Sequence, residues 1–122
     1  MRNSLKKNKM LRGILYEIVS SDAAGATLRL LPDSPVYQGH FPGYPITPGV
    51  CLVEIAIELI GQMAGPDAKV RLVGAKNIKF TSPVIPEAGK ELRYNLSGEG
   101  STREVEVLYG DVLSAKMSLS VE

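Results

Sequence analysis

The fold is decided by residues 47–65, which read TPGVCLVEIAIELIGQMAG. Thr47 belongs to the residue types that cap helix N-termini, and Pro48 suits the first helical position, where its missing N–H has no intrahelical acceptor. Gly65 followed by Pro66 is a typical stop signal. The pattern therefore predicts one helix of about 17 residues, roughly 25 Å long at 1.5 Å per residue.

Apolar residues cover most sides of this helix, from Val50 to Met63. Such a helix is typically enclosed by other elements, because a surface helix keeps one polar face. The polar interruptions are Glu54, Glu58 and Gln62, which are spaced i, i+4, i+8 and therefore form one stripe along the helix.

Strands are expected on both sides of the helix, where β-branched residues and alternation dominate. Two precede it, at 13–20 and 26–31, with a turn at 22–25. Four follow it, at 70–80, 91–97, 103–109 and 112–121, the last two joined by a Gly110-Asp111 turn. In the last strand, the odd-numbered residues from Leu113 are expected to be buried and the even-numbered residues from Ser114 to face water. Residues 32–45 are rich in proline and glycine and are expected to form an irregular loop.

A sheet must bury its apolar face, and a helix that is apolar all round must be covered. An antiparallel sheet of about six strands wrapped around one long central helix meets both needs. We therefore expect an α+β hot-dog fold, in which residues 1–12 form a basic N-terminal tail and residues 13–122 the domain. The total of 122 residues suits one such domain. The alternative for the tail is an electrostatic patch for an acidic partner.

Composition excludes several classes of protein. A formal net charge of +1 does not favour a nucleic-acid binder. The one cysteine, Cys51, cannot form an internal disulfide, and no apolar run approaches the roughly 20 residues that cross a bilayer. Arg12 and Glu17 interrupt the apolar stretch after the basic start, so no cleaved signal is expected. We expect a cytoplasmic protein with neither nucleic-acid nor membrane partners.

The residues with chemical potential lie in segment 39–54, which reads GHFPGYPITPGVCLVE. His40 is the only histidine of the chain, and Glu54 lies two turns into the predicted helix. Between them is a helix N-terminus, whose first amides have no acceptor within the helix. A base, an acid and anion-stabilising amides are what a β-elimination next to a thioester carbonyl requires.

Taken singly, each of these residues has a structural interpretation. A lone loop histidine such as His40 is more often a hydrogen-bonding or surface residue, and Glu54 fits a paired structural charge equally well. Cys51 is better interpreted as a small buried apolar residue than as a nucleophile, because no second histidine is available to activate it. One histidine and one cysteine do not make a zinc site, so no metal is expected.

The whole segment resembles the signature of the bacterial 3-hydroxyacyl-[acyl-carrier-protein] dehydratases, His-Phe-Pro-Gly-x-Pro-x-x-Pro-Gly-Val followed by Glu. The matching positions are His40, Phe41, Pro42, Gly43, Pro45, Pro48, Gly49, Val50 and Glu54. Residues 75–86, AKNIKFTSPVIP, are similar to that family's third strand, and the resemblance covers residues 14–122. The family usually has a further segment before the first strand, so a short form lacking it is expected. Glu58 stands where the family usually has glutamine.

The resemblance implies a hot-dog lyase that dehydrates 3-hydroxyacyl-[acyl-carrier-protein] to the trans-2-enoyl form in fatty-acid, polyene or related lipid biosynthesis. It implies that His40 takes the C2 proton and that Glu54 protonates the leaving hydroxyl. The amides of Gly49 and Val50 would stabilise the thioester oxygen, aided by the helix dipole. No cofactor is implied. Because the family builds each site from two subunits, a homodimer or a higher oligomer of dimers is expected.

Two alternatives stay open: a hot-dog acyl thioesterase, and a non-catalytic acyl-binding hot-dog partner subunit. Glu58 is expected to act through Glu54, since two nearby carboxylates resist joint ionisation; the alternative is that it faces solvent or pairs with a lysine. The acyl carrier protein is expected to dock on basic residues near the third strand, with a plain solvated face as the alternative. These basic residues are Arg71, Lys76 and Lys79.

Overall fold

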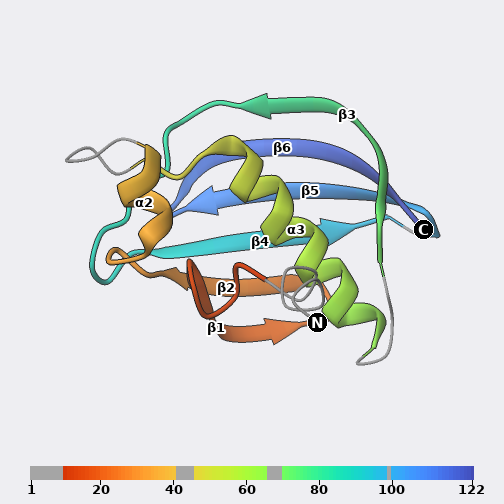
Figure 1. Ribbon diagram of the computed structural model, residues 1–122. Coiled ribbons are helices and arrows are strands. Elements are labelled where there is room, and N and C mark those ends of the chain that lie inside the picture. Colours follow the sequence, from red (N-terminus) through yellow and green to blue (C-terminus); the bar gives the residue numbers. More distant parts are fainter. Residues whose placement is uncertain (1–9, 41–45, 66–69, 99) are drawn as a thin grey trace, which may run out of the picture.

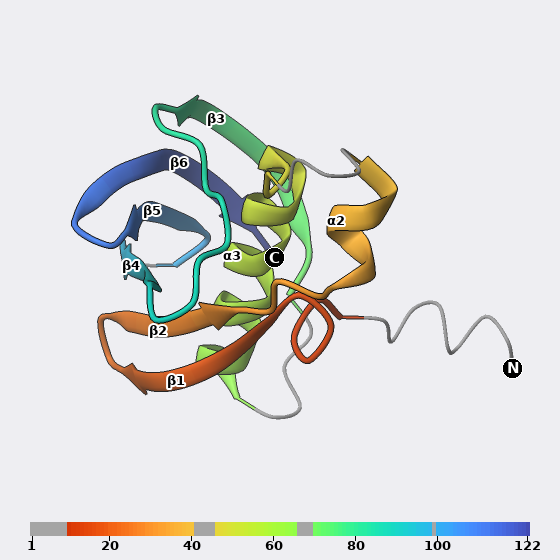
Figure 2. The ribbon, with the colours of Figure 1, turned by 90° about the vertical axis from the view of Figure 1, so that its left-hand side faces the viewer.

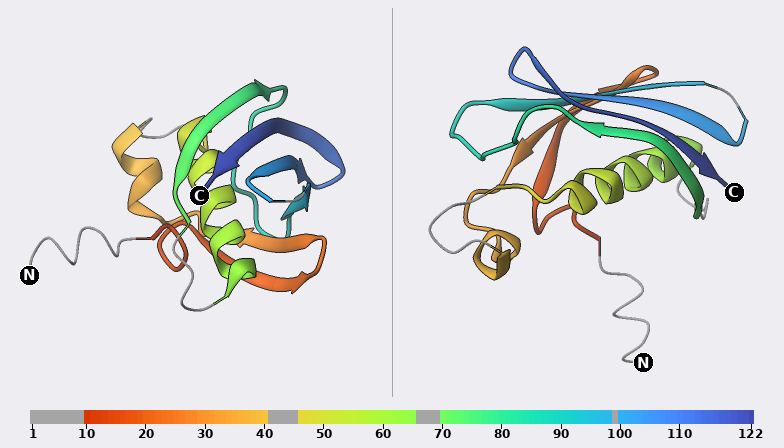
Figure 3. Two further views of the ribbon diagram at one scale, coloured as in Figure 1. Left: turned by 90° about the vertical axis from the view of Figure 1, so that its right-hand side faces the viewer. Right: turned by 90° about the horizontal axis from the view of Figure 1, so that it is seen from above.

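The computed structural model describes residues 10–40, 46–65, 70–98 and 100–122. In chain order its elements are β1 (Tyr16–Asp22), β2 (Gly25–Leu30), α2 (Pro35–His40), α3 (Gly49–Ala64), β3 (Leu72–Phe80), β4 (Glu91–Ser97), β5 (Thr102–Tyr109) and β6 (Val112–Val121). The strands form one antiparallel sheet in the order β1-β2-β4-β5-β6-β3, and α3 lies along one face of it (Figures 1 and 3). This is the α+β arrangement expected from the sequence.

The β1–β2 hairpin is closed by a tight turn that depends on glycine. The Ala24 amide donates to Asp22 Oδ1 over 2.8 Å, and Gly25 follows with a φ of 152°. A Cβ at Gly25 would lie 1.9 Å from the carbonyl oxygen of Tyr94 on the neighbouring strand. Only glycine therefore lets β2 approach β4 closely enough to pair with it.

The β5–β6 hairpin turns at Gly110, which has a φ of 64°. The expected alternation along β6 holds from Ala115 to Val121 but is wrong at the start of the strand. There Ser114 is 1% exposed and Leu113 is 39% exposed. The β5–β6 pairing shifts beside Ser114, and an extra residue in one strand exchanges the two faces.

The core lies between α3 and the sheet. Leu28, Ile55 and Leu119, from β2, α3 and β6, are each fully buried. Tyr94, at the centre of the sheet on β4, donates its hydroxyl hydrogen to the carbonyl oxygen of Leu52 over 2.8 Å, which ties the sheet to the helix. Figure 2 shows the curved sheet on one side of α3 and α2 on the other. Val50 remains 72% exposed, so one chain does not enclose the helix completely.

The expectation of an irregular loop at 32–45 is wrong for residues 35–40, which form α2. Ser34 Oγ accepts from the Val36 amide over 3.2 Å, and Pro35 takes the first helical position. A serine cap followed by proline is a helix-start signal that outweighs the local abundance of glycine and proline. Residues 41–45 lie outside the described part of the chain.

The predicted cap of the long helix is also wrong. Helix α3 begins at Gly49 with Pro48 as its cap residue and without a side-chain capping bond. Thr47 is instead buried, because its hydroxyl pairs with that of Tyr37 at 2.9 Å and its amide donates to the Val84 carbonyl at 2.8 Å. The helix ends at Ala64, before Gly65; Pro66 lies outside the described residues.

Strand β3 is an edge strand and pairs irregularly with β6. Its register shifts between Leu72 and Gly74 and again between Lys76 and Lys79, where Asn77 has a φ of 54°. Bulges of this kind bend an edge strand and increase its twist. Within the described ranges, no helix has the length and apolar character needed to cross a bilayer.

Candidate active site

His40 is the last residue of α2, whose axis lies beside the N-terminal end of α3 (Figure 1). Its side chain, like residues 41–45, lies outside what the structure describes. Helix α2 is fastened by Tyr37, which is 3% exposed and bonds to Thr47 just before α3. Burial raises the pKa of Tyr37 to about 12, so its hydroxyl stays neutral. The backbone that carries His40 is therefore held close to the start of α3.

Gly49 and Val50 form the first turn of α3. The Pro48 carbonyl accepts hydrogen bonds from the Cys51 amide at 2.9 Å and from the Leu52 amide at 3.2 Å. The hydrogen bonding of the helix therefore starts with the amide of Cys51, after Gly49 and Val50. First-turn amides carry the positive end of the helix dipole and are suited to binding an oxyanion.

The aromatic ring of Phe80, at the end of β3, covers Gly49. A Cβ at Gly49 would lie 2.7 Å from the ring, so this close approach depends on glycine. Phe80 is 51% exposed, and the helix N-terminus is therefore flanked by apolar surface.

Glu54 follows one helical turn after Val50, and its side chain is exposed. Although the side chain reaches solvent, the surrounding protein removes part of its hydration and so raises the pKa of its carboxyl group, and the negative charge of Glu58 raises it further. A carboxyl group that keeps its proton closer to neutral pH is suited to donating it. Glu54 and Glu58 both belong to α3, one helical turn apart, as their spacing predicted.

Glu58 is buried, with 9% of its surface exposed. Its carboxylate accepts hydrogen bonds from the amides of Leu11 (2.8 Å) and Arg12 (3.2 Å) and from the Tyr16 hydroxyl (2.8 Å). The alternative that Glu58 faces solvent or pairs with a lysine is therefore wrong. Leu11 and Arg12, which the sequence assigned to the tail, make contacts with α3.

Cys51 is buried, and burial, followed by the charge of Glu54, raises the pKa of its thiol. Such a thiol is a poor nucleophile, which agrees with the interpretation of Cys51 as a small apolar residue. In the described part of the chain, no three histidine, cysteine, aspartate or glutamate side chains cluster in a way that could hold a metal ion.

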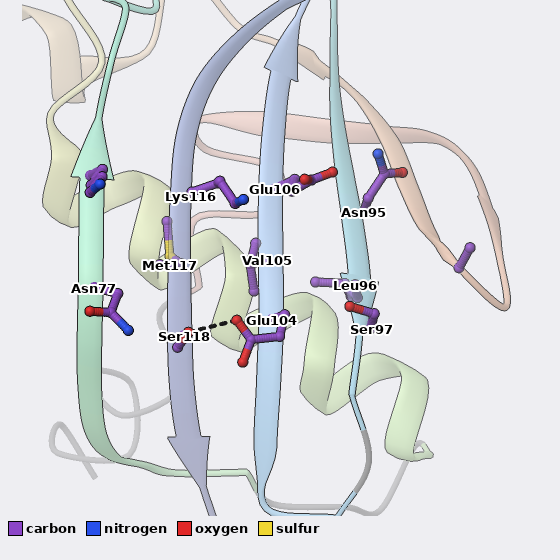
Figure 4. Close-up of a pocket in the computed structure, with 12 residues that line it drawn as sticks. Asn77, Asn95, Leu96, Ser97, Glu104, Val105, Glu106, Lys116, Met117 and Ser118 are labelled. Atoms are coloured by element: carbon purple, nitrogen blue, oxygen red, sulfur yellow. Dashed lines mark hydrogen bonds between the residues drawn. The ribbon is translucent and has the colours of Figure 1, made fainter.

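A groove of about 660 Å³, lined by polar and apolar side chains, lies on the face of the sheet opposite α3 (Figure 4). Asn77, Lys116 and Glu104 contribute to its lining, and Glu104 accepts a 2.6 Å hydrogen bond from Ser118. Lys79, predicted as a docking residue, also lines it, whereas Gly49, Val50 and Glu54 do not. The sequence did not predict this groove, because it depends on the curvature of four neighbouring strands.

The sequence also missed the buried tyrosines that support the site. Tyr16, Tyr37 and Tyr94 bond to Glu58, Thr47 and the Leu52 carbonyl, respectively. A buried tyrosine needs a partner for its hydroxyl, so apolar positions occupied by tyrosine were a usable signal. The identity of each partner depends on the tertiary fold.

Comparison with known proteins gives consistent results. Residues 17–115 match the model of the ApeI-like family, described as ApeI dehydratase. The chain is similar to the 3-hydroxyacyl-[acyl-carrier-protein] dehydratase FabZ of Geobacter metallireducens, with 38% identity over 80 residues, which cover 60% of this chain and 52% of that protein. For FabZ of Roseobacter denitrificans the identity is 36% over 88 residues, covering 66% and 58%. The match thus spans little more than half the length of these curated relatives.

Solved structures share the fold. The dehydratase heterocomplex ApeI:P from Xenorhabdus doucetiae gives a TM-score of 0.68 at 18% identity, covering 87% of this chain and 96% of that chain. A thioesterase family protein from Silicibacter pomeroyi gives 0.60 at 15% identity, covering 98% and 92%. These likenesses confirm the hot-dog fold. Because the second of these proteins is named a thioesterase, the fold alone does not select the reaction.

Proposed function

Because the chain belongs to the ApeI-like dehydratase family, we propose that it removes water from a 3-hydroxyacyl-[acyl-carrier-protein] to give the trans-2-enoyl thioester. One observation carries the proposal: Glu54, with a raised pKa, lies one turn beyond the helix N-terminus formed by Gly49 and Val50. We place the reaction in fatty-acid, polyene or related lipid biosynthesis in the cytoplasm.

The proposed elimination uses three groups of the chain. The amides of Gly49 and Val50 stabilise the thioester oxygen as negative charge develops on it. His40 takes the proton from C2, the electrons of that C–H bond form the C2–C3 double bond, and the C3–O bond breaks. Glu54 protonates the departing hydroxyl, which leaves as water. The raised pKa of Glu54 supports its role as the acid.

We propose that a second copy of the chain completes the site, so that His40 and Glu54 act across the interface of a homodimer. Strand β3 ends the sheet, and an open edge is a template for pairing with another chain. Apolar side chains are exposed beside it, with Val73 at 52%, Phe80 at 51% and Val50 at 72%. An apolar channel between the two copies would hold the acyl chain.

The acyl carrier protein is the proposed partner, and Lys76 and Lys79 of β3 are the proposed docking residues, since both are exposed. Arg71, the third residue predicted for this role, forms an ion pair with Glu122 at the end of the chain. It therefore has less free charge to offer an acidic partner.

The test is dehydration of carrier-bound 3-hydroxyacyl substrate by the wild type, His40→Ala and Glu54→Ala. General acid–base groups contribute on the order of 10²–10⁴-fold each, so both variants should lose most turnover and keep the fold. Gln62→Ala, an exposed position on the same stripe, is the matched control and should stay active. Near-wild-type turnover in either site variant would refute the assigned roles.

Product analysis separates the alternatives. Release of free thiol without enoyl product would identify a thioesterase, and acyl binding without turnover would identify a partner subunit. Mixing His40→Ala with Glu54→Ala protomers should restore one competent site in each mixed dimer. If verified subunit exchange restores no activity, the site is built within one chain.

A further inference from the structure

Glu58 is a buried carboxylate whose donors come from one short segment of the chain. The amides of Leu11 and Arg12 and the hydroxyl of Tyr16 all point at it, at 2.8, 3.2 and 2.8 Å. A charge buried in this way is tolerated only when hydrogen bonds replace its lost water. These three donors therefore stabilise the buried Glu58 carboxylate, and the proposed elimination does not use this group.

The segment that supplies the donors is the N-terminal turn, residues 11–16. It is internally bonded, since the Leu15 amide donates to the Leu11 carbonyl and the Gly13 amide to the Tyr16 carbonyl, both at 2.7 Å. Leu15 is fully buried, which anchors the turn in the core. In Figure 1 the turn leads into β1 beside α3. Glu58 is thus the point at which α3 holds this turn.

We propose that Glu58 is a positioning residue: it fastens the N-terminal turn to α3 and places a hydrogen-bonded carboxylate one helical turn from the proposed acid, Glu54. The neighbouring charge helps Glu54 to keep its proton until the leaving hydroxyl takes it. This inference rests on the proposed function, because it assigns Glu54 the role of acid. The direction of the effect agrees with the raised pKa of Glu54, to which burial contributes most and Glu58 next.

The other titratable groups around Glu54 do not replace Glu58 in this role. On the same helix, the pKa of Cys51 is raised, so its thiol is neutral. From β1, burial raises the pKa of Tyr16 far above its ordinary value, so its hydroxyl is neutral as well. From the N-terminal turn, the Arg12 guanidinium donates to exposed Gln62 at 3.1 Å, at the other end of the stripe. Among the described groups, Glu58 is the negative charge that raises the pKa of Glu54.

The deciding experiment is a direct titration of Glu54 by carboxyl-carbon NMR in the wild type and in Glu58→Gln, with Glu54→Gln to assign its signal. Loss of the neighbouring charge should move the Glu54 midpoint to lower pH. Glu106→Gln, which removes an exposed carboxylate from the sheet face opposite α3, should leave it unchanged. An unchanged midpoint in folded Glu58→Gln would overturn the inference.

If Glu58→Gln fails to fold, Glu58→Met replaces it in the same titration of Glu54, because methionine has a similar length and carries neither charge nor a polar group that needs a partner. Loss of the neighbouring charge should again move the Glu54 midpoint to lower pH. No movement would refute the coupling. Neither titration requires turnover, so an inactive wild type would count against the proposed function and leave this test intact.

Activity supplies a further readout if the wild type dehydrates its substrate. In Glu58→Gln the basic limb of the kcat profile, where Glu54 loses its proton, should move to lower pH while KM changes little. A merely structural residue would lower kcat at all pH values without moving the limb, and that outcome would overturn the inference.

Discussion

Removing the hydroxyl of Tyr37 or of Thr47 tests whether α2 is fastened to the segment that leads into α3. The two oxygens are 2.9 Å apart, and the residues are 3% and 4% exposed. Tyr37→Phe leaves the Thr47 hydroxyl buried without this partner, and Thr47→Val does the converse. An unsatisfied buried polar group costs about 1–3 kcal/mol, so each single substitution should lower the free energy of unfolding by that amount.

The double variant gives the sharper result. With both hydroxyls gone no polar group is stranded, so Tyr37→Phe/Thr47→Val should cost about as much as one single substitution rather than the sum. The coupling energy from urea unfolding of all four proteins should be about 1–3 kcal/mol, within the range of contacting pairs. Additive costs, with no coupling, would show that this hydrogen bond does not hold the two segments together.

Turnover of the same variants separates stability from positioning. If α2 places His40, loss of the Tyr37–Thr47 bond should lower kcat in the single variants and also in the double variant, even though the double variant avoids the additive loss of stability. A double variant with wild-type kcat would show that the position of His40 does not depend on this bond.

Three further predictions follow from packing, burial and charge. Gly89 has a φ of 81° and open space around it, so Gly89→Ala should lower the free energy of unfolding by about 1–2 kcal/mol. A Cβ at Gly25 would meet the Tyr94 carbonyl, so Gly25→Ala should cost about 1–3 kcal/mol more. Equal losses in the two variants would contradict the close approach of Gly25 to Tyr94. Burial raises the pKa of each of the four described tyrosines above 10, so their contribution to the free energy of unfolding should be fully present below pH 10 and decrease as the pH rises further. Urea unfolding at stepped pH measures this decrease, and a free energy of unfolding that stays constant above pH 10 would contradict it. Lys76→Glu and Lys79→Glu should each raise KM for carrier-bound substrate. Added salt should reduce the difference in KM between the wild type and these variants, because the Debye length falls from ~10 Å at 0.1 M to ~3 Å at 1 M. A KM of the wild type that does not change with salt would argue against electrostatic docking.

The elements that the sequence predicted well are those whose signal is local and periodic. Strand β4 and most of β6 follow from alternation, and α3 follows from its apolar residues between Pro48 and Gly65. The start of β6 was mispredicted because the face of Ser114 depends on its register with β5, a property of two strands together. Helix α2 was missed although its signal, Ser34 followed by Pro35, was present in the sequence.

The candidate site was predictable to the extent that its residues share one element. The spacing of Glu54 and Glu58 placed them on one side of the helix, and in the structure both belong to α3, one helical turn apart. The donors to Glu58 were not predictable, because two of them are backbone amides, which leave no trace in residue type. The ring of Phe80 over Gly49 was missed for a similar reason, since it depends on where β3 joins the sheet. The catalytic role of His40 stays a prediction.

The irregular pairing of β3 with β6 limits how this chain can aggregate. An uninterrupted edge strand invites copy after copy to add in register, which is how fibrils grow. Here the positive φ of Asn77 and the register shift between Lys76 and Lys79 interrupt that edge, and two lysines flank the interruption. A strand that pairs with the first half of β3 meets a bend and positive charge in the second half. The bend and the two lysines therefore work against the continuous in-register addition of further copies along this edge.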